Sequence, residues 1–498
     1  MRLSKLLENL SEREIVYSGK HWEREITELS FDSRRIKQGA LFFCLTGGNA
    51  DGHDFARFAV KNGAVAVVVE KPLYALPVSV PQIVVENSRK ALSKISSRFY
   101  GEPCEHLRVI GITGTNGKTT TAHMLASILQ ASGKKTGVIG TLGAKYDGRE
   151  YPCDLTTPDP IALHKLFADM FLSGVEYVVM EVSAHALHYY KTDGIFFTAC
   201  IFTNCTQDHL DFFSDMESYK SAKKRLFSNE NCPLAILNGD DETGRKWGEE
   251  RLLTATEKEK TYFYGITEPA DAFAVVTNER LNGSEFVLNV NDEICRVSLS
   301  MTGRHNVYNA LAAATCAIAL GVEILWVEKG LNALKVVKGR LERVSTYQGA
   351  EIFVDFAHTP DGLEKSLSAL ERHCKGRLIC LFGCGGNRDK GKRPIMGQTV
   401  AKKCAFAVLT SDNPRYEDPL DILSDIERGY RRFSGKYVIV PNRERAIEYA
   451  IEHLREGDVL LVAGKGGERY QEIMGIKYEF NDNDIIEKIV KNKEKTTV

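Results

Sequence analysis

The segment that decides the fold is Gly111-Ile112-Thr113-Gly114-Thr115-Asn116-Gly117-Lys118-Thr119-Thr120. A short apolar strand at 107–110 precedes it, and an amphipathic helix that ends at Gly133 follows it. Its glycines allow backbone N–H groups to approach a polyphosphate, and the N-terminus of a helix offers an anion unpaired donors and a favourable dipole. Lys118 supplies a positive charge for the β- and γ-phosphates, and the hydroxyl of Thr119 suits Mg²⁺. The segment therefore predicts a loop that binds a nucleoside triphosphate.

The loop is a variant of the common phosphate-binding pattern. Five residues, 112–116, separate Gly111 from Gly117, where the common pattern has four, and Gly114 lies between them. The alternative is a tight turn between a strand and a helix, with no ligand. A turn does not require Gly-Lys-Thr-Thr at the start of the helix, so the pattern favours nucleotide binding.

Apolar strands alternate with helical stretches on both sides of this loop. The predicted strands are 64–70 and 82–86 before it, 176–182, 199–203 and 233–238 after it, and a second series at 352–356, 377–382, 405–409, 437–440 and 458–462. This alternation predicts an α/β protein with mostly parallel sheets and helices on both faces. A polar junction at 101–103 and a candidate hinge at 339–342 predict three domains, residues 1–103, 104–338 and 339–498.

The composition is that of an ordinary globular chain. Of 498 residues, 43% are hydrophobic and 26% are charged, and 65 basic side chains nearly balance 66 acidic ones. This balance argues against a nucleic-acid partner and against a polybasic membrane anchor. The longest apolar runs are strand-sized and the N-terminus has no signal-peptide pattern, so we expect a soluble, cytoplasmic protein without a membrane partner.

Twelve cysteines are scattered along the chain. The closest pairs, Cys200/Cys205 and Cys380/Cys384, have spacings that match no usual zinc knuckle. We therefore expect the cysteines to be small buried apolar residues rather than disulfide partners or zinc ligands.

At Gly111–Thr120 the sequence resembles the Mur ligases, ATP-dependent enzymes that form amide bonds in peptidoglycan synthesis. Further matches follow in the same order: Asp32-Ser33-Arg34, Gly39–Phe43, Asp51–His53, Thr203-Asn204, Asp208–Asp211, Gly303–Asn306 with Asn309, Asp355–Pro360, Gly383–Pro394 and Asp412–Arg415. Together they look like the members that add the third residue of the stem peptide to UDP-N-acetylmuramoyl-L-alanyl-D-glutamate. The resemblance implies a uridine-nucleotide-binding N-terminal domain, a central P-loop-type ATPase domain and a Rossmann-like C-terminal domain that binds the amino acid. It also implies a monomer.

Joining a carboxylate to an amine through an acyl phosphate brings two anions together, so metal ions and cations must neutralise them. By resemblance, Lys118, Glu181, His209 and Lys223 are the catalytic residues, and Thr119, Glu181, His209 and Lys223 hold Mg²⁺. Taken alone, Glu181 is a carboxylate at the end of a strand, and an isolated histidine is more often structural. Lys223 lies on a predicted helix at 219–223 and matches the lysine that reacts with CO₂ in these ligases. The resulting carbamate would be an anionic oxygen donor.

The resemblance also assigns the nucleotide contacts. Besides the loop residues Gly114, Thr115, Asn116, Gly117, Lys118, Thr119 and Thr120, they are Asn306, Asn309, Arg340 and Asp355. The two asparagines can hydrogen-bond an adenine edge, although Asn306 can equally cap a helix. Arg340 and Asp355 flank the candidate hinge, and in the family such residues reach the nucleotide when the third domain closes and excludes water.

Residues of the first two domains match contacts to the UDP-sugar dipeptide. They are Ser33, Gly48, Asn49 and Ala50 for the uridine nucleotide, and Leu155, Thr156, Thr157, Ser183, Tyr189 and Lys191 for the sugar dipeptide. Most can equally serve turn chemistry. The sequence departs from the family at Ala184, within the usual Ser-Ser-His run, and at Tyr189 and Lys191, where Gln and Arg are usual. Lysine keeps the charge but loses the planar fork of arginine.

The C-terminal domain carries the predicted site for the added amino acid. Arg415 follows the predicted strand 405–409 and so lies at the edge of an open sheet where ligands of such folds bind. The resemblance implies contacts from Arg388, Asp412, Asn413, Pro414, Arg415, Gly464 and Glu468. One arginine fits the α-carboxylate, the other fits a second carboxylate, and Glu468 fits an ammonium group. The alternative is that these loop arginines are simply solvated.

Arg415 also predicts which amino acid is added. Members of the family that add meso-diaminopimelate carry arginine at this position, whereas those that add L-lysine usually do not. With lysine bound, Arg415 would be desolvated without an anion, at a cost of roughly 2–5 kcal/mol. That is a preference of about thirtyfold to a few thousandfold. Gly467, where the family usually has histidine, is a local departure.

Other functions remain open at this point. An L-lysine-adding ligase, another Mur ligase or a folylpolyglutamate synthetase is possible within the superfamily, although the last generally lacks the domain that precedes the phosphate loop. A non-catalytic nucleotide-binding protein is the alternative outside enzymes. Gly383-Cys384-Gly385-Gly386 lacks the spacing of a dinucleotide-binding fingerprint, so a dehydrogenase is disfavoured.

Overall fold

The computed structural model describes residues 1–8, 10, 13–16, 23–48, 50–228, 232–433 and 435–496, without the side chains of 13–16 and 496. Asn49, one of the predicted uridine contacts, lies outside the described residues. The chain forms two compact units. The first comprises Met1–Gly111, Lys135–Thr198 and Arg225–Cys232, and the second comprises Ile112–Lys134, Ala199–Lys224 and Pro233–Val498.

The N-terminal part of the first unit is a five-stranded sheet in the order β1-β5-β4-β3-β2, with only β1 antiparallel to its neighbour. Its strands are β1 (Arg13–Val16), β2 (Glu28–Ser30), β3 (Ala40–Phe43), β4 (Ala64–Val69) and β5 (Gln82–Val85), and its helices are α1 (Leu3–Leu6), η2 (Ser33–Arg35), η3 (Gly52–Phe55), α2 (Ala56–Lys61) and α3 (Ser88–Phe99). In β4, Val68 packs with α3 on one face while Val67 packs with α2 on the other. A strand covered on both faces reads as a continuous apolar run, which is why residues 64–69 show no alternation.

The remainder of the first unit carries strands in the order β6-β10-β7-β8-β9, with β10 parallel to β7. Its elements are η4 (Pro103–Glu105), β6 (Arg108–Thr113), β7 (Thr136–Gly140), β8 (Gly143–Tyr146), β9 (Arg149–Tyr151), α5 (Pro160–Leu172), β10 (Tyr177–Glu181), α6 (Ala184–His188) and η5 (Arg225–Phe227). The last two residues of β6 already belong to the second unit. Parallel pairing brings the carboxyl ends of β7 and β10 to one edge, where Thr141 and Glu181 meet.

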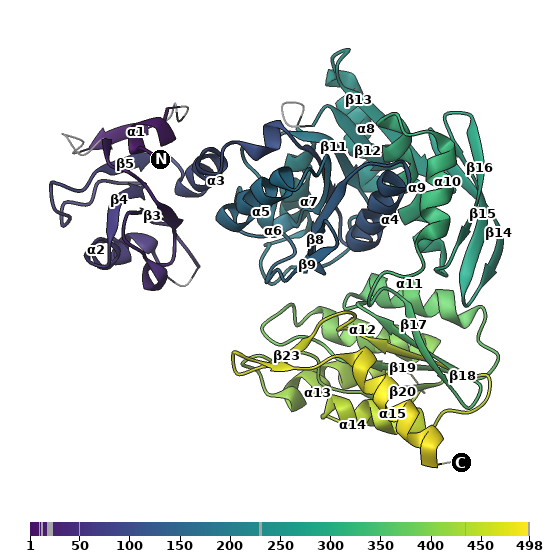
Figure 1. Cartoon of the computed structure of the whole chain (residues 1–498). Helices are drawn as coiled ribbons and strands as arrows, with labels where there is room; N and C mark the ends of the chain where they lie inside the picture. Colours follow the sequence, from purple (N-terminus) through teal and green to yellow (C-terminus); the bar gives the residue numbers. More distant parts are fainter. Residues whose placement is uncertain are drawn as a thin grey trace. The chain divides into compact units, whose positions relative to one another are not determined.

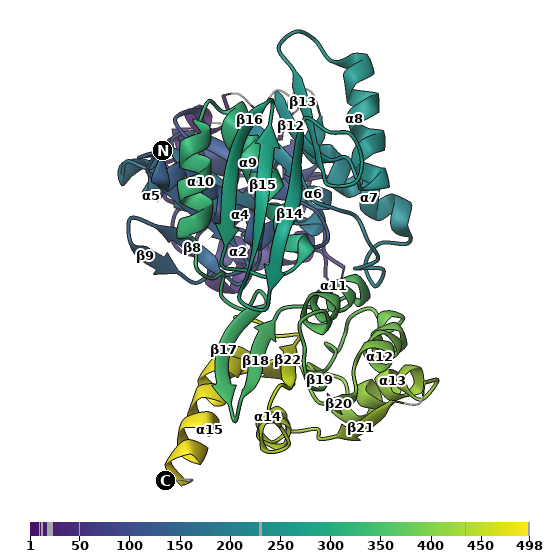
Figure 2. The same cartoon turned by 90° about the vertical axis from the view of Figure 1, so that its right-hand side faces the viewer.

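The second unit begins with the phosphate loop and contains strands in the order β16-β15-β14-β13-β12-β11. Its first elements are α4 (Lys118–Ala131), β11 (Phe197–Phe202, shared with the first unit), α7 (Met216–Lys224), β12 (Leu234–Asn238), α8 (Glu242–Thr254), β13 (Lys260–Gly265), β14 (Ala272–Arg280), β15 (Gly283–Val290), β16 (Glu293–Leu299), α9 (Arg304–Ala319) and α10 (Ile324–Ala333). Helix α4 packs against α9 and α10 (Figure 1). The closest approach is at Gly330, where a Cβ atom would collide with the backbone of Ile128. Strands β14, β15 and β16 form an antiparallel meander (Figure 2), which the strand alternation did not predict.

The C-terminal part of the second unit is a six-stranded sheet in the order β17-β18-β22-β19-β20-β21, parallel except for β17. The helices and strands of this C-terminal part, β23 and β24 outside the six-stranded sheet included, are β17 (Glu342–Tyr347), β18 (Ala350–Asp355), α11 (Pro360–Glu371), β19 (Leu378–Phe382), α12 (Lys392–Lys403), β20 (Phe406–Leu409), α13 (Pro419–Tyr430), β21 (Lys436–Ile439), α14 (Arg443–Glu452), β22 (Val459–Ala463), β23 (Tyr470–Ile473), β24 (Ile476–Glu479) and α15 (Asp482–Thr496). Helices α11, α12 and α13 contribute to the core on one face of this sheet, and α14 and α15 contribute to the core on the other (Figure 2). The predicted α/β class with mostly parallel sheets is confirmed.

Two general features complete the fold. Most of the twelve cysteines are buried, as expected for small apolar residues. Over the part of the chain that the structure describes, no helix is both long and apolar enough to cross a membrane.

Candidate active site

The phosphate loop joins β6 to α4, and Lys118 is the first residue of that helix. Gly114 has a φ of +150° and Gly117 a φ of +89°, and a Cβ atom at either position would collide with the side chains of Thr203 or Asn309. Both glycines are therefore required by backbone conformation and by space. The Nζ atom of Lys118 donates hydrogen bonds of 2.9 and 3.0 Å to the carbonyl oxygens of Gly114 and Thr115, so its charge lies over the loop.

Lys223 is buried on α7, with only 1% of its surface exposed. Burial, and then the nearby charge of Lys118, lower the pKa of Lys223 to about 7. Its Nζ atom lies 4.3 Å from the centre of the Tyr219 ring. A lysine with this pKa is about half neutral at pH 7, and the neutral amine is the form that reacts with electrophiles such as CO₂.

Asp208 forms a buried cluster that the sequence did not single out. It follows β11 and is 4% exposed. Its Oδ1 atom accepts a hydrogen bond of 3.2 Å from Nζ of Lys392, and its Oδ2 atom lies 3.3 Å from Nε2 of His209 and 3.8 Å from Nε2 of His358. Burial by itself would raise the pKa of Asp208, but the nearby side chains of His358 and Lys392 hold it well below the usual range of a carboxyl.

His209 therefore contacts a carboxylate in this structure. Its φ of +57° is unusual for a non-glycine residue, and its backbone N–H donates a 2.9 Å hydrogen bond to Oδ1 of Asp208. All members of the cluster stand in the motifs quoted from the sequence, but in separate ones, so the motifs alone did not show that they meet.

Two residues of the C-terminal part reach the phosphate loop within the second unit. Nη2 of Arg340 donates a 2.7 Å hydrogen bond to the hydroxyl of Thr119, and its guanidinium stacks 4.4 Å from the ring centre of Phe356. Nδ2 of Asn116 donates a 2.8 Å hydrogen bond to Oδ2 of Asp361. The predicted nucleotide residue Arg340 thus lies at the loop, and Asp361 is an addition to the predicted set.

Asp355, a nucleotide contact by resemblance, is held by hydrogen bonds within the C-terminal part. Its carboxylate accepts hydrogen bonds from the backbone N–H of Leu341 at 2.5 Å, from that of Ala357 at 3.0 Å and from the hydroxyl of Ser366 at 2.9 Å. Burial raises its pKa, although Arg340 opposes this shift. Leu341 has a φ of +45°, so Asp355 holds the strained residue that follows Arg340.

The two predicted adenine-binding asparagines are linked to each other on α9. Nδ2 of Asn309 donates a 3.2 Å hydrogen bond to Oδ1 of Asn306, and Nδ2 of Asn306 donates a 2.7 Å hydrogen bond to the carbonyl oxygen of Thr302. Helix α9 has Gly303 at its N-cap and no side-chain cap, so Asn306 does not serve as the cap. The hydroxyl of Thr121, on α4, donates to Oδ1 of Asn309 at 3.3 Å.

In the first unit, Glu181 lies at the end of β10 and is 1% exposed. Its carboxylate accepts hydrogen bonds from the backbone N–H and the hydroxyl of Thr141, at 2.8 and 3.1 Å. The hydroxyl of Thr141 lies 3.1 Å from that of Thr156, and the hydroxyl of Thr157 donates a 3.0 Å hydrogen bond to the carbonyl oxygen of Glu181. Gly140 packs so tightly against the Glu181 side chain that a Cβ atom would collide with it.

The same unit brings more of the predicted sugar-dipeptide residues together. The backbone N–H of Ser183 donates a 3.0 Å hydrogen bond to Oγ1 of Thr157, and Nζ of Lys191 donates one of 3.3 Å to the carbonyl oxygen of Thr157. Burial lowers the pKa of Lys191. Leu155, also predicted to contact the sugar dipeptide, is half exposed.

Arg89, which no motif indicated, connects two of the predicted regions. Its guanidinium lies 4.2 Å from the ring centre of Tyr189, and its Nη2 atom donates a 2.8 Å hydrogen bond to the carbonyl oxygen of Thr46. Thr46 precedes the predicted uridine contacts Gly48 and Ala50, both exposed, whereas Ser33 begins η2 and is half-buried. Only the fold makes Arg89 a neighbour of these residues.

The predicted amino-acid site is built on loops of the C-terminal sheet. Lys465 is fully buried, and its Nζ atom donates hydrogen bonds of 2.9 Å to Oδ1 of Asn413 and to Oε2 of Glu468. Nδ2 of Asn413 also donates to Oε2 of Glu468 at 3.0 Å, and the backbone N–H of Asn413 donates to Oδ1 of Asp412 at 2.7 Å. Glu468 is predicted to contact an ammonium group of the ligand. One of its carboxylate oxygens, Oε2, already accepts hydrogen bonds from two protein donors. Burial would raise the pKa of Asp412, but Lys465 lowers it below the usual range.

Arg415 also has a protein partner that the sequence did not predict. Its Nε atom donates a 3.1 Å hydrogen bond to Oε2 of Glu472, and its Nη1 atom donates one of 2.8 Å to the carbonyl oxygen of Gly386. Gly386 packs against the carbonyl group of Pro414 with no room for a Cβ atom, and Gly464 (φ +113°) packs against Asp412. Arg388 lies on the same loop as Gly386 and is exposed.

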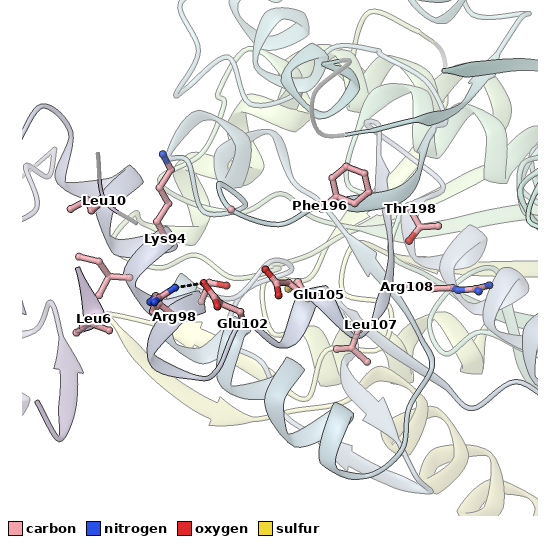
Figure 3. Close-up of a pocket in the computed structure, with 14 residues that line it drawn as sticks. Leu6, Leu10, Lys94, Arg98, Glu102, Glu105, Leu107, Arg108, Phe196 and Thr198 are labelled. Carbon is pink, nitrogen blue, oxygen red and sulfur yellow. Dashed lines mark hydrogen bonds and ion pairs between the residues drawn. The ribbon is translucent and has the colours of Figure 1, made fainter. Parts of the chain in front are cut away.

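The first unit also contains a pocket of about 680 Å³ that none of the predicted residues line (Figure 3). Its walls include apolar Leu107 and Phe196 together with charged Lys94, Arg98 and Glu105. Arg98 is already paired with Glu102 at 3.1 Å. The pocket is therefore separate from the candidate substrate residues.

Over the part of the chain that the structure describes, no group of three or more His, Cys, Asp or Glu side chains is arranged to hold a metal ion.

Comparison with known families covers most of the chain. Residues 112–317 match the Mur ligase middle domain, residues 339–466 match the Mur ligase glutamate ligase domain, and residues 25–100 match the Mur ligase family catalytic domain. The chain belongs to the Mur ligase family. The resemblance seen in the sequence motifs is thereby confirmed, and with it the enzyme class, an ATP-dependent amide ligase.

Individual Mur ligases match this chain over most of its length. The UDP-N-acetylmuramoyl-L-alanyl-D-glutamate–2,6-diaminopimelate ligase of Geobacillus thermodenitrificans is 42% identical over 476 residues, covering 94% of this chain and 96% of the relative. A ligase of the same name from Clostridium acetobutylicum is 43% identical over 470 residues, covering 94% and 95%. A solved structure with this name has a TM-score of 0.66 and 29% identity over 95% of this chain and 96% of that one.

A folylpolyglutamate synthase from Mycobacterium tuberculosis, solved with ADP and AMPPCP, also shares the fold. It has a TM-score of 0.62 at 17% identity, and the match covers 76% of this chain and 92% of that one. This Mur ligase therefore has sequence beyond the part that such synthases share.

Proposed function

We propose that this Mur ligase adds meso-2,6-diaminopimelate to UDP-N-acetylmuramoyl-L-alanyl-D-glutamate, with ATP as co-substrate. The observation that carries this proposal is Arg415, which is bridged to Ile473 of the β23–β24 hairpin and lies two residues after Asn413, a member of the network with Lys465 and Glu468. The names of the full-length relatives support the same substrates.

The reaction proceeds in two balanced steps. A carboxylate oxygen of the D-glutamate residue attacks the γ-phosphorus of ATP, which forms an acyl phosphate and releases ADP. The amine of the incoming amino acid then attacks the acyl carbon, the carbon–oxygen bond to phosphate breaks, and the amine loses a proton. The backbone N–H groups at the start of α4 would bind the phosphates, and Lys118 adds positive charge against the transferring group. Arg340 and Asn116 tie the C-terminal part to this loop and so help to exclude water from the acyl phosphate.

The donors proposed for Mg²⁺ are the Thr119 hydroxyl, the Glu181 carboxylate, the His209 imidazole and a carbamate on Lys223. Oxygen-rich sets of this kind suit Mg²⁺, which commonly relies on phosphate oxygens of the nucleotide for its remaining ligands. The buried amine of Lys223, with a pKa of about 7, fits carbamate formation because only the neutral amine reacts with CO₂. When bound, Mg²⁺ supplies positive charge against the two reacting anions.

The acceptor would bind to the first unit. Ser33, Gly48, Asn49 and Ala50 would contact the uridine nucleotide, and Leu155, Thr156, Thr157, Ser183, Tyr189 and Lys191 would contact the sugar dipeptide. The hydrogen bonds that join Thr157, Ser183 and Lys191 support a common site for the second set. We place the reaction in the cytoplasm, where ATP is supplied, and expect a monomer of three domains with boundaries near residues 103 and 339.

The test is a phosphate-release assay with purified protein, ATP, Mg²⁺ and the UDP-sugar dipeptide. Phosphate release and a product of the expected mass should require meso-diaminopimelate and should be much slower with L-lysine. Equal rates with both amino acids would reject the proposed specificity. No phosphate release with any diamino acid would reject the proposed activity.

A further inference from the structure

The loop that carries Arg415 is attached to a small hairpin, β23–β24. The hairpin turns at Met474 and Gly475, whose φ values of +50° and +76° are those of a tight two-residue turn. The backbone N–H of Arg415 donates a 3.1 Å hydrogen bond to the carbonyl oxygen of Glu472, and that of Met474 donates one of 2.7 Å to the carbonyl oxygen of Arg415. Arg415 itself has a φ of +51°, so the hairpin holds it in a conformation that arginine rarely adopts.

Two further hydrogen bonds fix the hairpin without using the Glu472 side chain. The backbone N–H of Glu472 donates to Oδ1 of Asn413 at 2.9 Å, and Nε2 of Gln471 donates to the carbonyl oxygen of Asp412 at 2.7 Å. The carboxylate of Glu472 is therefore not needed to place the hairpin. Its only hydrogen-bond donor among the described side chains is Arg415, at 3.1 Å.

The contacts of Arg415 leave one edge of its guanidinium for a ligand. A guanidinium carries five N–H donors in a planar fork, and two of its edges can each hold a carboxylate in a bidentate pair. The Nε–H donates to Glu472, and Nη1 gives one N–H to the carbonyl oxygen of Gly386. Within the described residues, no acceptor engages Nη2, so the edge formed by Nη1 and Nη2 is left for a bidentate carboxylate. The side chain is 19% exposed, which gives a ligand access to it.

We propose that Glu472 is a positioning residue for amino-acid selection: it anchors Nε of Arg415 so that the Nη1–Nη2 edge receives the second carboxylate of the substrate. Without this anchor the long side chain would sample several rotamers, and ordering it would cost free energy when the substrate binds. The inference rests on the proposed use of a diamino dicarboxylic acid. It adds a residue that lies outside the motifs quoted from the sequence.

The experiment compares Glu472→Ala and Glu472→Gln with Glu479→Ala, an exposed acidic residue on the other strand of the same hairpin. Steady-state kinetics with meso-diaminopimelate, ATP and the UDP-sugar dipeptide give KM for each substrate and kcat. We expect Glu472→Ala to raise KM for meso-diaminopimelate about tenfold, as for loss of a charge-assisted hydrogen bond, and to leave KM for ATP and kcat unchanged. Glu472→Gln should have a smaller effect because its amide oxygen still accepts from Nε, and Glu479→Ala should match the wild type.

The possible results separate this inference from the proposed function. An unchanged KM for meso-diaminopimelate in Glu472→Ala would overturn the positioning role, and a lower KM would show that Glu472 competes with the substrate instead. A parallel change in KM for ATP, kcat and melting temperature would show that Glu472 only supports the fold. A wild-type protein that does not use meso-diaminopimelate at all would overturn the proposed function, and this inference with it.

Discussion

The guanidinium of Arg340 donates a 2.7 Å hydrogen bond to the hydroxyl of Thr119, although the two residues are 221 positions apart. This contact joins a residue of the predicted hinge to the residue that follows Lys118 at the start of α4. Because Asp355 holds the backbone of the next residue, Leu341, the position of Arg340 is set by the C-terminal sheet. The nucleotide site therefore depends on residues of the phosphate loop and of the C-terminal part of the second unit.

Replacing Arg340 should impair the use of ATP. We expect Arg340→Ala to lower kcat/KM for ATP by about ten- to a hundredfold, because a charge-assisted hydrogen bond at the loop is lost. Arg343→Ala is the matched control, since Arg343 is exposed on β17 and pairs with Glu351. Equal kinetics for both variants, measured by phosphate release at varied ATP, would contradict a role at the nucleotide.

The buried amine of Lys223 predicts a pH-dependent stability. Its pKa is about 7 in the folded protein and 10.5 ordinarily, so between these values the unfolded chain binds a proton that the folded chain does not. The free energy of unfolding should therefore rise with pH from about 7 to 10.5. Below pH 7 the buried amine is charged in the folded protein, and the full cost of burying that charge lowers the stability. Lys223→Met should raise the melting temperature at pH 6 and lose this advantage towards pH 10.

Calorimetry in CO₂-free buffer measures this effect without the carbamate. Lys220→Met, on the same helix α7, is the control and should show no such pH dependence. In activity assays at limiting Mg²⁺, Lys223→Ala should lose most of its turnover. Full activity there would exclude Lys223 from the metal site.

Replacing Arg415 should change the amino-acid specificity of the enzyme rather than abolish all of its activity. Arg415→Ala should reduce the preference for meso-diaminopimelate over L-lysine by about thirtyfold or more. Without Arg415, binding of L-lysine no longer leaves a desolvated guanidinium without a carboxylate partner. The preference is the ratio of the two kcat/KM values. Arg432→Ala, an exposed arginine after α13, should leave that ratio unchanged.

The ionised carboxylate of Asp208 should make a contribution to folding stability that is lost in acid. Its pKa is well below 3.8 in the folded protein, so its carboxylate stabilises the fold above the ordinary pKa, and that contribution is lost as the pH falls through the folded value. Asp208→Asn should cost about 3–5 kcal/mol near neutral pH because Lys392 stays buried without its carboxylate. Denaturant unfolding at pH 7 and at several pH values below 3.8 measures this, with exposed Asp211→Asn as the control. If pairing with Lys392 is the cause, Lys392→Met should restore part of the loss in the double variant.

Much of the site was predictable because its signals are local. Lys118 and Thr119 were predicted from a strand, glycines and a helix start that are contiguous in the chain, and Arg415 from a loop that follows a strand. Arg89 and Glu472 carried no such signal, since an arginine or a glutamate in a surface-like sequence is usually solvated. The meander β14–β16 was missed because no strand was predicted between residues 239 and 351, where consecutive antiparallel strands lack the alternation of strand and helix on which the prediction relied.

The sequence by itself determined the alternation of strands and helices, the anion-binding turn at the start of α4 and the family to which the chain belongs, because these depend on neighbouring residues. The tertiary structure alone decided which charges meet: Asp208 with Lys392, 184 positions apart, and Arg415 with Glu472, 57 positions apart. It also decided that Lys223 is buried and so has a pKa near 7. The physical reason is that the solvation of a charge and the distance to its partners are set by packing between distant segments.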